Sequence, residues 1–229
     1  MRKRTLTVLI AGGVVAVGAI AAVSAPMFYR DVVVGAAAPI PAVTASALTA
    51  GAGVDPADVQ GAWQLGRGSY AGYRVDEVLN GTDVTVVGRT DQVTGALTVE
   101  GQALTAASIT VDVASITSDM GSRDSYFRNT AMKTFRHPTA TFVLTEPVTA
   151  ASAPRLGVAQ PVTATGELTL AGVTRTVAVQ LDAAFDGESG QVAGSIPVTF
   201  ADFGVDAPHL GFVQVEDKGT IEFSLMLVR

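Results

Sequence analysis

Short segments in which apolar and polar residues alternate fill the chain from residue 62 to the C-terminus. In one of them Ile109, Val111 and Val113 fall on one face, and the polar residues between them fall on the other. A period of two is typical of a β-strand with one wet and one dry side. We expect strands at residues 70–77, 82–89, 95–100, 103–116, 139–147, 162–170, 174–185, 192–200 and 219–228.

Turn residues separate these segments. Asn80-Gly81 is a strong hairpin signal, because the tightest hairpin turns need residues that tolerate positive φ. Only residues 121–136 lack alternation, and we expect a short helix there. Eight or nine antiparallel strands with almost no helix to cover them leave exposed sheet edges unless the sheet closes on itself. The sequence therefore predicts an all-β fold, a closed antiparallel barrel with a short helical insertion.

The N-terminus carries an apolar run of 23 residues, 6–28, which follows Arg2, Lys3 and Arg4 with only Thr5 between. A membrane span needs about 20 such residues, whereas the apolar region of a cleavable signal has about 7 to 15. We therefore expect residues 1–29 to form one transmembrane helix that is kept as a signal anchor, with a cytoplasmic N-terminus. The alternative is cleavage after Ala25, which would release a secreted domain.

Residues 30–61 read as a flexible linker. Of the 28 residues from 35 to 62, 17 are Ala, Gly or Pro, and no helix or strand period persists. Fully extended, such a segment reaches on the order of 90 Å, and as a coil roughly 30 Å. We expect it to tether a single domain, residues 62–229, on the extracytoplasmic side of the cell membrane.

Composition excludes several classes of function. The net charge of -6 and a pI near 4.8 argue against nucleic acid as a partner. The absence of cysteine excludes disulfides, thiolate metal sites and a cysteine nucleophile. The two histidines have no acidic partners at metal-ligand spacing, and no hydrolase or nucleotide-binding motif occurs. We expect no metal, no catalytic residues and no enzyme activity.

One basic segment stands out in this acidic domain, which has 11 Lys and Arg against 18 Asp and Glu. Arg123, Arg128, Lys133 and Arg136 fall within 14 residues, and His137 follows. Because guanidinium groups pair well with phosphates, Arg123, Arg128, Arg136 and His137 are candidate ligands for the head group of a bound molecule. The alternative is a solvated surface helix in which Arg123 pairs with the neighbouring aspartate.

A set of short motifs occurs in a fixed order along the domain. They are Trp63, VTG at 93–95, VDVASIT at 111–117, Arg123-Asp124, FRHP at 135–138, Thr141-Phe142, GELTL at 166–170, GVTR at 172–175 and FADFG at 200–204. In this order they resemble the YceI family, the lipid-binding barrels of bacterial envelopes. The resemblance implies an extended, eight-stranded, lipocalin-like antiparallel barrel that holds a polyisoprenoid with a quinone or pyrophosphate head. It implies no catalysis and no cofactor beyond that ligand.

Three functions remain open on this basis. The leading one is carriage or storage of a long isoprenoid lipid, either a polyprenyl pyrophosphate or an isoprenoid quinone. The second is a stress or adhesion protein that uses the exterior of a filled barrel, and the third is an enzyme that acts on a bound lipid. Because the strands carry many small residues, we predict an elongated cavity lined mostly by Val, Leu, Ile, Ala and Phe.

Overall fold

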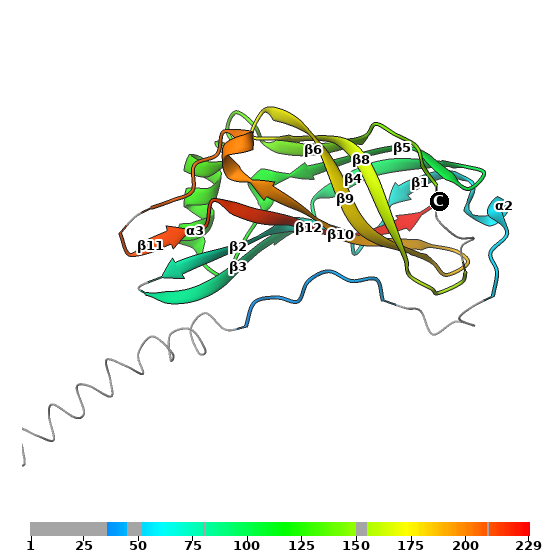
Figure 1. The fold of residues 1–229 in the computed structure, drawn as a ribbon, viewed down its shortest axis with the longest axis horizontal. Coiled ribbons are helices and arrows are strands. Elements are labelled where there is room, and N and C mark those ends of the chain that lie inside the picture. The colour runs from blue at the N-terminus through cyan, green and yellow to red at the C-terminus, as the bar shows by residue number, and fades with distance from the viewer. Residues whose placement is uncertain (1–35, 45–51, 80, 150–154, 210) are drawn as a thin grey trace, which may run out of the picture.

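The computed structural model describes residues 36–44, 52–79, 81–149, 155–209 and 211–229 (Figure 1). The predicted anchor, residues 1–29, lies outside these ranges. Among the residues that are described, no helix is both long and apolar enough to cross a membrane.

Antiparallel strands make up most of the domain. The long ones are β2 (Tyr70–Leu79), β3 (Thr82–Thr90), β4 (Val93–Glu100), β5 (Ala103–Asp112), β6 (Thr139–Leu144), β8 (Gln160–Leu170), β9 (Val173–Phe185), β10 (Gly190–Thr199) and β12 (Lys218–Val228). The short ones are β1 (Gly61–Leu65), β7 (Val148–Thr149) and β11 (Val213–Val215). The alternating pattern therefore located the long strands and missed the short ones.

The sheet closes into an eight-stranded barrel. β1 and β2 pair with successive stretches of β12, and β4 and β3 pair with β1 and β2 in the same way. β1 and β2 are therefore two parts of one long barrel strand, and β3 and β4 are two parts of its neighbour. Going round the barrel, the order is β1/β2, β3/β4, β5, β6, β8, β9, β10 and β12, and pairing of β1 with β12 closes the ring. The predicted all-β antiparallel barrel is confirmed.

The predicted helical insertion lies at one end of the barrel. It begins with α3 (Gly121–Tyr126) and continues as a π-helical turn, η3 (Phe127–Ala131). Figure 1 shows α3 and β11 at this end, which we call the α3 end, and α2 (Pro56–Val59) with the C-terminus at the opposite end.

The strand predicted over residues 103–116 ends early. β5 stops at Asp112, and residues Val113–Ser115 form a 3-10 turn, η2. The Asp112 carboxylate accepts a hydrogen bond from the amide of Ala114 at 2.9 Å, which stabilises a turn at the expense of the strand ladder. A second 3-10 turn, η4 (Phe200–Phe203), follows β10.

Part of the predicted linker lies against the barrel. Residues 36–44, which we call the strap, run along the outside of the barrel (Figure 1). Ala38 and Pro39 accept hydrogen bonds from strand residues, and the amide of Thr44 donates to Gln191 Oε1 at 2.9 Å. Closer to the domain, Val54 is buried in the cluster around Trp63. These two stretches therefore have fixed partners on the domain.

Candidate functional site

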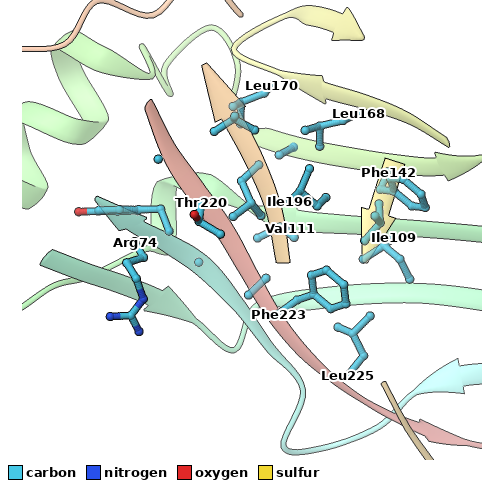
Figure 2. A pocket seen from close by; sticks show the side chains of 18 of the residues that line it. Arg74, Ile109, Val111, Phe142, Leu168, Leu170, Ile196, Thr220, Phe223 and Leu225 are labelled. Carbon is cyan, nitrogen blue, oxygen red and sulfur yellow. The ribbon is translucent and has the colours of Figure 1, made fainter. Parts of the chain in front are cut away.

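The interior of the barrel contains one large cavity of about 820 Å³. This is in the upper part of the roughly 300–1,000 Å³ typical of small-molecule sites. Odd-numbered residues of β12, together with Thr220, and even-numbered residues of β8 line it, largely as strand alternation requires. Figure 2 shows the apolar side chains from several strands converging on this space, among them Ile109, Val111, Phe142, Leu168, Leu170, Ile196, Phe223 and Leu225.

Small residues keep the cavity open. Ala71, Ala107, Ala140 and Ala164 are buried and line it. The Phe142 ring lies so close over Gly166 of the next strand that a Cβ atom there would sit 2.3 Å from the ring. Glycine at this position lets the ring lie against the wall instead of filling the interior. The predicted apolar cavity is confirmed, and its lining is of the residue types expected.

Few charged side chains border the cavity. Within the described chain they are Arg74, Glu77, Arg123, Arg155 and Asp206. Figure 2 shows that the guanidinium of Arg74 points away from the apolar side chains. Arg123 and Glu77 therefore provide the main buried charges at the α3 end, while Arg155 and Asp206 are exposed.

Arg123 lies between two carboxylates, in what we call the inner cluster. It donates to Glu77 Oε1 at 2.8 Å and to Asp119 Oδ1 at 2.5 Å. The Glu77 side chain is 5% exposed and that of Asp119 is 41% exposed. Burial alone would lower the pKa of the Arg123 guanidinium, but the hydrogen bond and charge of Glu77, with the charge of Asp119, raise this pKa above its usual value. Arg123 is therefore permanently charged and already paired.

Tyr73 adds a neutral polar group beside this cluster. Its ring stacks on Phe127 with centroids 4.8 Å apart, and both residues line the cavity. Burial raises the pKa of the Tyr73 phenol to about 12, although the nearby Arg123 charge acts in the opposite direction. The phenol therefore stays protonated at neutral pH, and it is hydrogen-bonded to the side chain of Ser118.

Of the four candidate head-group residues, only Arg123 lines the cavity. Arg128 donates to the carbonyl of Ile116 at 3.4 Å. Arg136 is exposed and lies over the ring of Phe135, with 5.4 Å between the guanidinium carbon and the ring centroid. The ring of His137 packs against Gly172 in the β8–β9 turn. The structure thus does not bring the four together at one cavity wall, and a head-group role for any of them stays a prediction.

A second charged group, the outer cluster, lies on the outside of the barrel. The Glu222 carboxylate, 2% exposed, pairs with both Arg74 and Arg89, and its Oε2 lies 3.3 Å from an Arg89 nitrogen. The same two arginines donate to the strap, at 2.6 Å to the carbonyl of Ala38 and 2.6 Å to that of Pro39. The Arg89 guanidinium also lies 4.8 Å from the centroid of the Tyr70 ring.

Sequence reasoning missed Glu77 and the whole outer cluster. Gly72 explains how the latter forms, because it lies between Arg89 and Glu222 in the strand register, and a Cβ atom there would meet the backbone of Gly88 at 1.9 Å. Residues 89 and 222 are far apart in sequence, so only the barrel register brings them together. No local pattern could have revealed them.

Comparison with known proteins identifies the relatives of the domain. Residues 64–227 match the model of the YceI-like domain. A polyisoprenoid-binding domain from Saccharophagus degradans, implicated in plant cell wall breakdown, is 18% identical with a TM-score of 0.58, covering 72% of this chain and 97% of that one. BcnA of Burkholderia cenocepacia is 22% identical with a TM-score of 0.54, covering 67% of this chain and 95% of that one. No curated protein sequence matches the chain.

Proposed function

The chain belongs to the YceI-like family, and we propose that it binds a long-chain isoprenoid lipid inside its barrel. The observation that carries the proposal is the apolar cavity of about 820 Å³. Burying an isoprenoid tail there is favourable by roughly 0.8 kcal/mol for each CH₂-sized group, without any matching hydrogen bonds. The related Saccharophagus domain is named a polyisoprenoid-binding domain, which supports the same ligand class.

The proposal includes where and how the lipid is held. We place the barrel outside the cytoplasm, attached through residues 1–29, and we assign it carriage or storage of the lipid without chemical turnover. The basic residues before the apolar run favour this orientation. An enzyme acting on the bound lipid would convert it on incubation, so recovery of unchanged lipid is the expected result.

The alternative, a stress or adhesion protein that uses only the barrel exterior, requires a filled interior. An open apolar cavity favours lipid binding over it. A protein that used only the barrel exterior would tolerate a bulky residue inside the barrel. A variant with such a residue therefore distinguishes lipid binding from an exterior-only function.

Extraction of the purified full-length chain with organic solvent, followed by mass spectrometry, tests the proposal. We expect an isoprenoid in stoichiometric amount. Ala164→Phe places a ring in the cavity from β8 and should abolish recovery of the lipid, whereas Ala178→Phe adds the same ring to an exposed position on β9. A wild-type extract without any long apolar lipid, or equal recovery from the two variants, would contradict interior binding.

A further inference from the structure

The charges at the α3 end of the cavity are unbalanced. Arg123 is the one cation whose charged group faces this end among the described lining residues, and Glu77 and Asp119 both bind it. Asp206 adds another carboxylate to the lining. Asp124 is also buried close by, where it accepts hydrogen bonds from the amide and hydroxyl of Ser118. Around Arg123 the carboxylates therefore outnumber the single guanidinium, and the other basic residues of the insertion, Arg128 and Arg136, do not line the cavity.

An anionic head group would meet these carboxylates first. A phosphate that pairs with Arg123 must either displace Glu77, whose carboxylate is 5% exposed and would be left buried without its partner, or accept from a remaining N–H while it lies beside two carboxylates of like charge. Leaving one member of a buried ion pair unmatched is strongly unfavourable. The sequence suggested that arginines here attract phosphate. In the structure, however, Glu77 and Asp119 already neutralise the charge of Arg123.

A neutral head group meets no such obstacle. The two bonds of Arg123 use one N–H on each of its terminal nitrogens, out of five N–H groups in a guanidinium. A carbonyl or hydroxyl oxygen can accept from a remaining N–H without displacing either carboxylate.

We propose that the α3 end selects an isoprenoid with an uncharged head, such as a quinone or a prenol, and that Glu77 and Asp119 exclude phosphorylated isoprenoids. This inference rests on the proposed function, because it specifies the head group of the lipid bound in that same cavity. Glu77 and Asp119 are then specificity residues that act by neutralising Arg123.

The test compares a prenyl quinone with a prenyl monophosphate of equal tail length, both bound to the detergent-solubilised full chain. Trp63, the single tryptophan, lines the cavity, so quenching of its fluorescence reports quinone binding, and the phosphate is measured by displacement. We expect wild-type protein to prefer the quinone by at least about tenfold, the effect of one charge-assisted bond. Equal affinity, or a preference for the phosphate, would overturn the inference and leave lipid binding intact.

Charge-removing variants locate the selectivity. Glu77→Gln should strengthen phosphate binding about tenfold and leave quinone binding within about twofold. Asp119→Asn changes an exposed partner of the same arginine, so it tests the idea even if the buried change destabilises the fold, and about a threefold gain is expected.

Arg155 provides the internal control, because it lines the cavity yet belongs to neither charged cluster. If Arg155→Ala weakens phosphate binding while Glu77→Gln has no effect, the head group lies elsewhere and the inference is wrong. Failure of both lipids to bind wild-type protein would instead overturn the proposed function, and this inference with it.

Discussion

The two charged clusters of this barrel have opposite ratios of acidic to basic side chains. In the inner cluster one guanidinium, Arg123, lies between the carboxylates of Glu77 and Asp119. In the outer cluster one carboxylate, Glu222, lies between the guanidinium groups of Arg74 and Arg89. The first borders the cavity, and the second lies under the strap.

The difference shows how the excess charge determines what each cluster can hold. The two arginines of the outer cluster have donors left after Glu222 is paired, and the strap carbonyls accept from them. The inner cluster has an excess of acceptors, so it has little to offer an anion. Buried charges need partners, and in the outer cluster the strap carbonyls supply part of what Glu222 alone leaves unmet.

Removal of the outer carboxylate should have the largest effect on stability. Glu222→Gln leaves Arg74 and Arg89 side by side without a counter-charge, and the two arginine side chains are only 17% and 26% exposed. We expect a loss of about 3 kcal/mol in the free energy of unfolding, or roughly 6–12 °C in Tm for a domain of this size. Denaturation followed by circular dichroism measures it. Glu216→Gln, in an exposed pair with Lys218, is the control and should have almost no effect.

Removal of the inner carboxylate should cost less. Glu77→Gln leaves Arg123 with Asp119, and the new amide oxygen can still accept a hydrogen bond. We expect a loss of about 1–2 kcal/mol in the same unfolding assay. A loss as large as that of Glu222→Gln would mean that the ratio of acidic to basic side chains does not govern the stability of the clusters.

The strap should respond to the outer cluster alone. Arg89→Ala removes the donor to Pro39, so a protease that cleaves after small residues should cut residues 36–44 about tenfold faster. Arg123→Ala should not change this rate, nor should Arg67→Ala, which removes an exposed arginine. Equal cleavage of wild type and Arg89→Ala would show that the arginine does not hold the strap.

The smallest effect concerns Tyr73, and it changes stability only at high pH. Because burial raises the pKa of this phenol to about 12, the folded state keeps its proton more tightly than the unfolded chain, whose tyrosines titrate near 10. The resulting contribution to stability is complete below pH 10 and is lost as the pH rises toward 12. Ultraviolet titration of tyrosinate should lose its highest step in Tyr73→Phe and keep it in Tyr70→Phe.

The alternation in the sequence was enough to predict the barrel but could not locate its site. Residues such as Ile109 and Val111 face inward as their spacing requires. Local pattern could not show that Asp112 ends β5 with its own side chain, or that His137 packs on a turn. The basic segment drew attention to Arg123. Its partner Glu77, which neutralises the arginine, lies on a strand 46 residues earlier. Charge counted along the chain cannot reveal which charges are already paired.

The strap also changes how freely an anchored barrel can move. With residues 36–44 held on the barrel wall, only residues 30–35 separate the predicted membrane helix from the domain. Six extended residues reach roughly 20 Å, far less than the full linker would allow. The strap starts nearer to the α3 end than it finishes (Figure 1). If the chain is anchored, this short tether keeps the barrel close to the membrane. The α3 end would then meet the bilayer surface more often than the opposite end.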